Sequence, residues 1–323
     1  MTTYKEIRGS QIQVVSSDPS NPVEGQVWYN STSNVLKGEA STTTGSWASG
    51  GSINTARKSA GGCGIQTAAL CFGGTSDPPT QALTEQYNGS AWTEVTDLNT
   101  ARAQVGSEGT YTSALAIGGG GTTVITEIWD GSSWTETGDL NNGRGYPKGA
   151  GPDSTAALAF GGTTPSGPEI SAFTEDWNGS AWTEVADLNT SRGNHGGTGK
   201  LKTAALCVGG SGDPDGTESW NGSAWTALAN LNTGRVNICA AGTYTSAIAF
   251  GGAETIALTE TWNGTAWTED GDLSQGRKNA AGAGADVSSG LAFTGETAPG
   301  ASLNDTEEWS GPGSPLTRTF TAS

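Results

Sequence analysis

Six tryptophans in this chain are each followed, ten residues later, by an arginine. The pairs are Trp47/Arg57, Trp92/Arg102, Trp134/Arg144, Trp182/Arg192, Trp225/Arg235 and Trp267/Arg277. Successive pairs are separated by 45, 42, 48, 43 and 42 residues. A repeat of this length exceeds a leucine-rich or ankyrin unit and matches one four-stranded blade of a β-propeller. The repeat therefore predicts an all-β fold of radially arranged sheets.

Each repeat divides into four segments typical of antiparallel strands, which we name a to d. Strand a is the glycine-rich run after the arginine, and strand b is an apolar run that ends at a glycine pair, as at Gly73-Gly74. Strand c contains Thr-Glu and an aromatic residue, and strand d begins with the tryptophan. An Asn-Gly or Asp-Gly pair precedes strand d in five repeats, which predicts a tight type I′ turn between c and d.

The order of the strands predicts how the repeats close. Six a-b-c sets run from Arg57 to Trp309, but the first d strand, at Trp47, precedes the first a strand. We therefore expect Trp47 to pair with strand c near Trp309, so that the amino-terminal strand completes the last sheet and removes both open edges. The expected domains are a segment at 1–45, a six-bladed propeller at 46–311 and a tail at 312–323. A seventh blade would need 1–45 and 312–323, which lack a strand ending in Gly-Gly.

The combination of a glycine pair ending one strand, a later aromatic residue, a following tryptophan and an arginine leading into the next unit resembles the kelch repeat. The resemblance covers residues 46–311 and recurs six times. It implies a six-bladed kelch-like β-propeller. Alanine and glycine replace the bulkier strand residues of most kelch blades, while the tryptophans supply apolar area of about 150–250 Å² each between blades.

Residues 1–45 have no counterpart among the repeats. Residues 25–37 alternate apolar and polar side chains around a polar turn, which predicts a lone hairpin. A lone hairpin is marginal in water and must pack on something, either the propeller or a larger assembly. The Gly-x-x-Trp-Tyr-Asn segment at 25–30 is similar to short hairpins of bacteriophage tail and fibre proteins. This resemblance implies a segment that attaches the chain to other virion proteins.

Charge and composition exclude several classes of partner. The sequence has 15 Lys and Arg against 32 Asp and Glu, a net charge of −17, so we expect no binding to nucleic acid and no attraction to anionic lipid. No run approaches the roughly 18 apolar residues of a membrane span, so we expect no membrane insertion. Residues 1–7 lack the apolar stretch of a secretion signal, which favours a chain that stays in the cytoplasm where it is made.

The four cysteines are interpreted as small core residues. They show neither CxxC spacing nor the density of a disulfide scaffold. Cys71 and Cys207 fall where the other repeats have alanine, as at Ala116. A Cys63–Cys71 bridge is the alternative.

The chain offers few groups for catalysis. Its single histidine, His195, lies in one a strand, whereas kelch-fold copper oxidases use two His and two Tyr as ligands. No GxSxG motif accompanies His195, and the Asp-Gly-Ser-Ser-Trp segment at 130–134 is one residue too short for the Asp box of sialidases. We therefore expect no enzymatic activity, no metal site and no cofactor.

The arginines have two interpretations. A group present in every repeat usually serves the fold, by bonding nearby carbonyls or the aspartate of the Asp-Leu pairs, such as Asp97-Leu98. Alternatively, the six guanidinium groups form an electropositive ring at one mouth that captures carboxylates. On that interpretation Arg57, Arg102, Arg144, Arg192, Arg235 and Arg277 are binding residues.

The loops between strands b and c vary where the c–d turns do not. The interval from the second glycine to the strand-c aromatic is 13, 10, 15, 10, 10 and 14 residues. Variable loops on a rigid scaffold are where recognition is usually placed. The candidate loops are 75–83, 163–173, 211–216 and 296–305, on the same face as the arginines. Their candidate binding residues are Asp77, Pro78, Thr164, Glu169, Phe173, Asp213, Asp215 and Asn304.

These features favour a non-enzymatic virion structural protein, a tail, fibre or decoration component assembled in the host cytoplasm. Its expected partners are other virion proteins, through 1–45, and a host-surface glycan or protein, within a homo- or hetero-oligomeric assembly. The alternative is a cytoplasmic kelch module that binds a cellular protein. A glycan-active enzyme is a third possibility, which lacks a credible acid–base set.

Overall fold

A computed structural model describes residues 12–20, 22, 25–41, 44–76, 79–120, 123–164, 169–313 and 315–320 of the chain. The chain is all-β, and its strands form seven four-stranded sheets. The sheets belong to two compact units. We name Ser46–Ser310 the repeat unit, and Met1–Gly45 with Gly311–Ser323 the terminal unit. Among the described residues, no helical segment has the length and hydrophobicity needed to span a bilayer.

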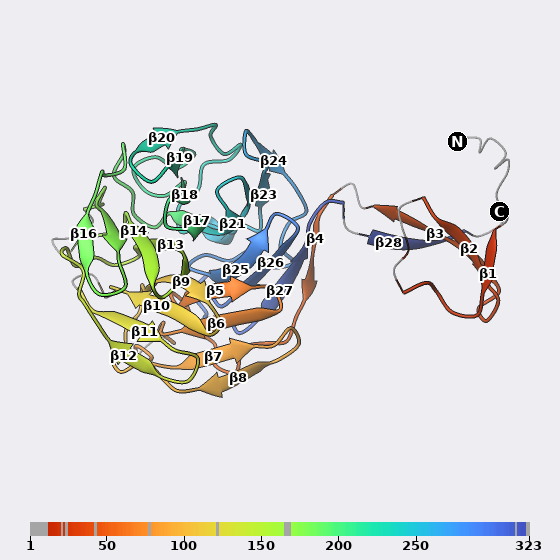
Figure 1. Cartoon of the computed structure of the whole chain (residues 1–323), viewed down its shortest axis with the longest axis horizontal. Helices are drawn as coiled ribbons and strands as arrows, with labels where there is room; N and C mark the ends of the chain where they lie inside the picture. Colours follow the sequence, from red (N-terminus) through yellow and green to blue (C-terminus); the bar gives the residue numbers. More distant parts are fainter. Residues whose placement is uncertain are drawn as a thin grey trace. The chain divides into compact units, whose positions relative to one another are not determined.

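The repeat unit contains six sheets, each with four antiparallel strands in the order a-b-c-d (Figure 1). The first sheet is β5 (Gly61–Ile65), β6 (Ala68–Phe72), β7 (Thr84–Tyr87) and β8 (Trp92–Val95). The second is β9 (Gly106–Thr110), β10 (Ser113–Ile117), β11 (Thr126–Trp129) and β12 (Trp134–Glu136). The third is β13 (Lys148–Asp153), β14 (Ala156–Phe160), β15 (Thr174–Trp177) and β16 (Trp182–Glu184). The fourth is β17 (Gly196–Leu201), β18 (Ala204–Val208), β19 (Thr217–Trp220) and β20 (Trp225–Ala227).

The fifth sheet is β21 (Cys239–Thr243), β22 (Ser246–Phe250), β23 (Thr259–Trp262) and β24 (Trp267–Glu269), with the short 3-10 helix η1 (Ala253–Thr255) in its b–c loop. The sixth joins β25 (Ala281–Asp286), β26 (Ser289–Phe293) and β27 (Thr306–Ser310) to β4 (Ser46–Ser49). In this sheet Trp47 lies opposite Trp309 and Ser46 opposite Ser310. The predicted pairing of the first d strand with the last c strand is confirmed.

Neighbouring sheets contact one another in a propeller-like arrangement. The a strands contact each other in the order β5, β9, β13, β17, β21 and β25, and β25 also contacts β5. Each d-strand tryptophan donates its indole N–H to the threonine that begins strand c of the preceding sheet. Trp134 donates to Thr84 Oγ1 at 3.0 Å, and Trp92 of the first sheet donates to Thr306 of the sixth at 3.0 Å. Trp47 does the same to Thr259, at 2.9 Å.

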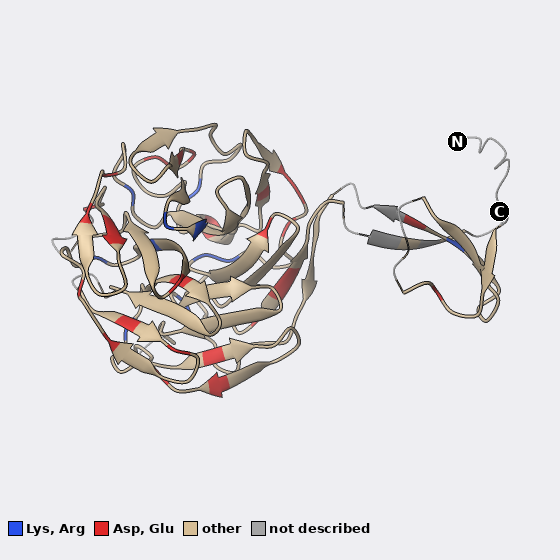
Figure 2. Ribbon diagram, viewed as in Figure 1, with Lys and Arg blue, Asp and Glu red and all other residues tan. Residues whose placement is uncertain are grey.

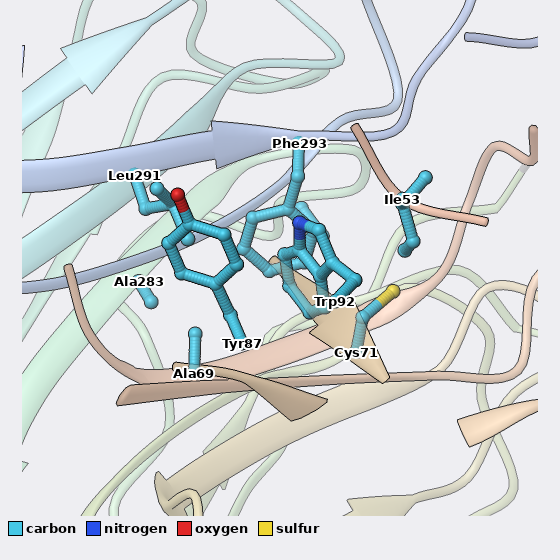
Figure 3. Packing of buried hydrophobic residues seen from close by; sticks show 9 residues of the cluster. Ile53, Ala69, Cys71, Tyr87, Trp92, Ala283, Leu291 and Phe293 are labelled. Carbon is cyan, nitrogen blue, oxygen red and sulfur yellow. The ribbon is translucent and has the colours of Figure 1, made fainter. Parts of the chain in front are cut away.

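Small residues in the a strands leave room for the aromatic side chains of neighbouring b strands. A Cβ added to Gly62 would lie 2.6 Å from Phe293 Cζ, so only glycine fits this close approach. Phe293 contacts Trp92 of the first sheet, with ring centroids 4.8 Å apart (Figure 3). The hydrophobic core therefore lies between sheets, which explains why strands poor in leucine and valine still bury large apolar surfaces.

All four cysteines are buried and free, as the core interpretation predicted. The alternative Cys63–Cys71 bridge is not formed. Cys71 Sγ instead lies 3.3 Å from a guanidinium nitrogen of Arg57.

The c–d turns differ from the predicted type I′ geometry. In the first sheet Tyr87 pairs with Trp92, which leaves a four-residue loop, and Gly89 has a positive φ whereas Asn88 does not. Asn88 Oδ1 instead accepts hydrogen bonds from the backbone N–H groups of Ser90 and Ala91, both at 3.0 Å. The asparagine is therefore selected for its side-chain acceptor, because Asn and Asp bond the backbone two residues on.

Asn221→Ala is expected to destabilise the repeat unit by about 1 kcal/mol, since it removes an acceptor for two backbone donors of the fourth sheet's turn. Asn221→Asp should be close to neutral, because Asp130 already makes the same two bonds, at 2.8 Å, in the second sheet. Urea unfolding followed by tryptophan fluorescence measures both. Equal losses in the two variants would contradict the capping role.

The terminal unit contains the seventh sheet, in the order β1 (Gln13–Val15), β2 (Val27–Asn30), β3 (Val35–Ser41) and β28 (Pro315–Phe320). The predicted hairpin is present as β2 and β3, with Asn30 opposite Val35. It is not a lone hairpin, because β1 pairs parallel with β2 and β28 pairs antiparallel with β3. Residues 315–320 are likewise not a separate tail. Four strands supply the pairing that a two-stranded hairpin lacks.

The Gly-x-x-Trp-Tyr-Asn segment holds a carboxylate within the terminal unit. Trp28 Nε1 and Asn30 Nδ2 donate to Asp18 Oδ1 at 3.0 and 2.8 Å, and Lys37 Nζ lies 2.5 Å from Asp18 Oδ2. These hydrogen bonds, from Lys37 above all, lower the pKa of Asp18 to about 2. Trp28 and Asn30 of this segment, together with Lys37 of β3, therefore join β2 and β3 to the residues that follow β1.

Candidate functional site

The six repeated arginines lie inside the sheets. Their exposed fractions are 0 to 3%, and each guanidinium lies 2.6 to 3.2 Å from the glutamate of the following Thr-Glu segment. The pairs are Arg57–Glu85, Arg102–Glu127, Arg144–Glu175, Arg192–Glu218, Arg235–Glu260 and Arg277–Glu307. The hypothesis of an electropositive ring that captures carboxylates is therefore wrong. Each positive charge is buried and already paired.

The glutamate of each pair connects strand c to the turn between strands d and a. In the third sheet, Glu175 Oε1 accepts from Arg144 at 2.8 Å. Its Oε2 accepts from the backbone N–H and the side-chain amide of Asn141, both at 2.8 Å. Burial lowers the pKa of Arg144, whereas the charge of Glu175 and its hydrogen bond to Arg144 raise that pKa. Through these hydrogen bonds, Glu175 holds the turn between strands d and a against strand c.

The repeated aspartates have a different partner from the one predicted. Asp97 and Asp187 accept the backbone N–H of the threonine that begins strand c, both at 3.0 Å, and Asp272 accepts the equivalent bond at 3.1 Å. The expected carbonyl contacts of the arginines are present, as from Arg144 to the Ala159 carbonyl at 3.3 Å. The acidic partner is the glutamate, which recurs in the sequence as regularly as the arginine.

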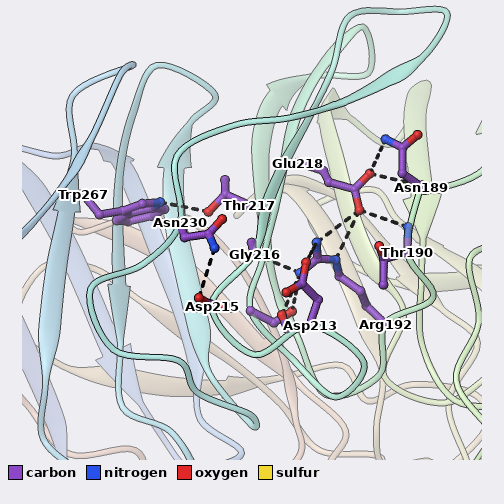
Figure 4. A network of polar contacts seen from close by, with 11 residues as sticks. Asn189, Thr190, Arg192, Asp213, Asp215, Gly216, Thr217, Glu218, Asn230 and Trp267 are labelled. Atoms are coloured by element: carbon purple, nitrogen blue, oxygen red, sulfur yellow. Dashed lines mark hydrogen bonds and ion pairs between the residues drawn. The ribbon is translucent and has the colours of Figure 1, made fainter.

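Arg192 extends its contacts into the b–c loop 211–216 (Figure 4). Its Nη2 donates to Asp213 Oδ2 at 2.9 Å and to Glu218 Oε1 at 3.1 Å, and its Nη1 donates to the Gly216 carbonyl at 2.9 Å. Asp215 Oδ2 accepts from Asn230 at 3.0 Å. Both candidate aspartates therefore hold the loop's own shape.

The other b–c loops are anchored at their bases and exposed further out. Bridges join Lys58 to Thr75, Gly145 to Thr163 and Lys278 to Glu296. In the loop 163–173, the half-buried Thr164 donates its backbone N–H to the carbonyl of the exposed Glu169, at 2.9 Å. Phe173 is 37% exposed, and Asn304 is exposed in the loop 296–305. The predicted residues Asp77 and Pro78 lie outside the described residues.

The loop 296–305 of the sixth sheet is fixed to the first repeat. Lys58 Nζ lies 2.6 Å from Glu296 Oε2, and Asn279 donates its amide to Glu296 Oε1 at 2.9 Å. Glu296 is only 7% exposed. The loop therefore presents its outer residues, among them Asn304, from a rigid base.

His195 is fully buried beside Phe160. Burial lowers its pKa well below the usual range of histidine, and the nearby charges of Lys148 and Arg192 lower it further. The imidazole is therefore neutral near physiological pH. It packs against the glycines that end two b strands, since a Cβ on Gly161 would lie 2.4 Å from His195 Cε1 and one on Gly210 would lie 2.6 Å from His195 Cβ.

No protein-family model matches this chain, and a search of curated proteins finds no match either. The resemblance to kelch repeats and to phage hairpins therefore rests on the residues quoted from the sequence.

One group of residues escaped the sequence analysis. Glu108, Lys148 and Lys200 lie on three consecutive a strands and line one cavity. A signal for them exists in the repeats, because each is a charged residue where the equivalent residues of the other repeats are uncharged. Strand a was interpreted only as a small-residue strand, so these exceptions were not singled out.

Proposed function

We propose that the chain is a non-enzymatic structural protein of a bacteriophage virion, in which a six-bladed kelch-like propeller presents b–c loops to a host surface or to neighbouring subunits. In this proposal the six sheets are the blades, and β4 closes the ring by completing the sixth. Support for closure comes from the contact between β25 and β5 and from the Trp-to-Thr hydrogen bonds that link every sheet to the preceding one.

The observation that carries the proposal is the contrast between repeated and varied groups. The arginines, glutamates and asparagines present in most repeats form hydrogen bonds within the repeat unit. The loops that differ between repeats expose side chains such as Glu169, Phe173 and Asn304 on anchored bases. Rigidly supported variable loops are suited to recognition.

The charge of the outer strands limits which partners the rim can accept. The d strands expose Glu94, Glu136, Glu184 and Glu269, and Figure 2 shows acidic residues recurring on the outer strands. Such a rim repels nucleic acid and anionic lipid. Contacts to a host glycan or protein are therefore assigned to the b–c loops.

The terminal unit is the proposed attachment to other virion proteins. It joins a segment that precedes the repeat unit to one that follows it, through the pairing of β3 with β28, and it contains the segment that resembles phage tail hairpins. A folded unit built from the segments on both sides of the repeat unit gives that unit a single point of attachment.

Mass spectrometry of purified particles, with immunogold labelling of this chain, tests the proposal. We expect the chain in intact particles, with an antibody to the loop 163–173 labelling them and slowing adsorption to the host. An antibody to the exposed residues Thr135 and Glu136 of β12 is the matched control and should label without slowing adsorption. A chain absent from particles but bound to a host protein in the cell would contradict the proposal and favour the cytoplasmic interaction module.

A further inference from the structure

The a strands of the repeat unit surround an axial cavity of ≈ 60 Å³. Most of its lining is glycine and alanine, as in Gly62, Gly149 and Ala283. Three acidic or basic side chains interrupt this lining, Glu108 on β9, Lys148 on β13 and Lys200 on β17. They lie in three consecutive sheets, and Lys200 extends across the cavity to β5 of the first sheet.

Each of these residues breaks the repeat pattern once. Six residues after the arginine, Glu108 replaces what is Cys63, Ala150, Thr198, Ala241 or Ala283 elsewhere. Four residues after the arginine, Lys148 replaces Gly61, Gly106, Gly196, Cys239 or Ala281. The repeat itself therefore folds without a charge at either position. Buried charges are costly, so their presence in single copies needs a reason other than the fold.

Lys200 reaches the axis through a local irregularity of β17. Thr198 pairs with Leu206 and Leu201 with Ala204, so two residues of β17 oppose one of β18. Such bulges redirect a side chain and often adjoin functional sites. Lys200 Nζ donates to the Gly64 carbonyl of β5 at 3.0 Å, on a different sheet of the ring. The ammonium group keeps two further N–H donors for another acceptor.

Glu108 is 4% exposed, and neither carboxylate oxygen receives a hydrogen bond from any described residue. The neighbouring strand has glycines that make room for it. A Cβ on Gly151 would lie 2.5 Å from Glu108 Oε2, and one on Gly149 would lie 2.7 Å from Glu108 Cβ. Burial raises the pKa of Glu108 well above its usual range, and Asp153 raises it further. The neutral acid that this favours can donate a hydrogen bond.

Lys148 carries the opposite charge to Glu108 and is half-buried. Its stem packs against β17, where a Cβ on Gly197 would lie 2.4 Å from Lys148 Cβ. Burial lowers the pKa of Lys148, and burial likewise lowers that of Lys200. Lys148 has no ion pair with any residue that the structure describes. A half-buried ammonium group without a counter-charge gains from the approach of an anion.

We propose that the axial cavity is a binding site for a small oxyanion, held by the ammonium groups of Lys148 and Lys200 and by a hydrogen bond from the Glu108 carboxyl. Three donors then meet one acceptor, and two positive charges disfavour a cation. A water position needs about 10–15 Å³, so the cavity of ≈ 60 Å³ has room for about four to six heavy atoms, a range that includes acetate and phosphate.

The two ends of the axis differ in a way that gives the ligand one route. At one end six residues with φ between 52° and 60° are linked by backbone hydrogen bonds, as from Gln104 N–H to the Ser59 carbonyl at 2.8 Å. The space there is only ≈ 20 Å³. At the other end Ile65, Tyr111 and Lys200 line a hollow of ≈ 450 Å³. The anion enters from this end, and Lys200 belongs to both the hollow and the cavity.

Isothermal calorimetry on the full chain, near neutral pH, with inorganic phosphate and with acetate tests the proposal. Sodium chloride at equal ionic strength and calcium chloride are the comparisons. We expect saturable binding of at least one oxyanion. Lys148→Met and Lys200→Met should each weaken it by about tenfold or more, the loss expected for one charge-assisted hydrogen bond. Lys202→Met is the matched control, because Lys202 pairs with Asp176 at 2.9 Å, and should leave binding unchanged.

A measurement on the unsubstituted chain keeps the proposal testable if a variant fails to fold. In the unsubstituted chain the affinity for the oxyanion should fall as the two lysines lose their protons, and because burial lowers the pKa of both lysines this fall should begin below the pH at which an exposed lysine titrates. No oxyanion binding beyond that of chloride, binding unaffected by both lysine substitutions, or preferential binding of calcium would each overturn the proposal.

Discussion

Glu175→Ala is expected to destabilise the repeat unit by about 3–5 kcal/mol, because it leaves the guanidinium of Arg144 buried without its counter-charge. Both side chains are fully buried, and the substitution also removes the acceptor of two Asn141 donors. Urea unfolding followed by tryptophan fluorescence measures the loss. The probe is suitable because eleven of the twelve tryptophans lie within residues 46–310.

Two further variants serve as controls for the loss of stability in Glu175→Ala. Glu184 lies directly opposite Glu175 on strand β16 and is exposed, so Glu184→Ala should change stability by no more than about 0.5 kcal/mol. Arg144→Met combined with Glu175→Gln should recover much of the loss, because no unpaired buried charge remains. A cost for Glu175→Ala as small as that for Glu184→Ala would contradict the buried-pair account of the arginines.

Trp47→Ala is expected to cost about 3–5 kcal/mol, towards the lower end of the range because Trp47 is only partly buried. Trp47 lies against Phe250 and Trp309, with ring centroids 5.1 and 5.3 Å away, and donates to Thr259 at 2.9 Å. The substitution therefore loosens β4 from both the sixth and the fifth sheets. Thermal and urea unfolding measure the effect.

Trp92→Ala is the internal reference for this prediction. Trp92 holds the equivalent position in the first sheet, is 5% exposed and donates to Thr306 at 3.0 Å. Its loss should cost as much as that of Trp47 or slightly more. A large effect of Trp92→Ala beside a negligible effect of Trp47→Ala would show that β4 does not contribute as the other d strands do.

The predictable features of the fold are those marked by short motifs that recur in every repeat. Glycine pairs, Thr-Glu segments and tryptophans recur at matching positions of the repeats, and their order predicted the order of the strands. The same order predicted the pairing of Trp47 with Trp309. The pairing of β28 with β3 could not be predicted in this way. It joins two segments that have no repeat partner and lie at opposite ends of the sequence.

The errors at the candidate site have physical causes. Loop length and spacing placed the arginines beside variable loops but gave no measure of burial, and burial decides whether a guanidinium is available to a ligand. The partner was assigned to the nearby Asp-Leu pairs, whereas each arginine reaches a glutamate 25 to 31 residues further along. The turn type was wrong because Asn-Gly was interpreted through φ alone, and the Asn88 side chain was not considered as an acceptor.

Departures from the repeat are also informative, as Glu108, Lys148 and Lys200 show. Residues that recur in every repeat are those that the fold requires. A charged residue that appears once, at a position otherwise filled by uncharged side chains, therefore indicates a role other than folding. That comparison uses the sequence alone. Only the structure, however, brings the three residues from separate repeats to one cavity.

Ring closure by the amino-terminal strand is the central claim, and a disulfide between positions 46 and 310 tests it most directly. Ser46 and Ser310 are exposed and lie opposite each other in the β4–β27 ladder, and Cα atoms of such pairs are about 4.5–5.5 Å apart, within disulfide range. The four native cysteines are buried. In Ser46→Cys/Ser310→Cys, mild oxidation followed by peptide mass spectrometry should find an intrachain 46–310 disulfide, and a matched Ser46→Cys/Ser132→Cys variant should form none. Unlinked cysteines after oxidation, or a 46–310 link found only between two chains, would contradict closure of the ring by its own first strand.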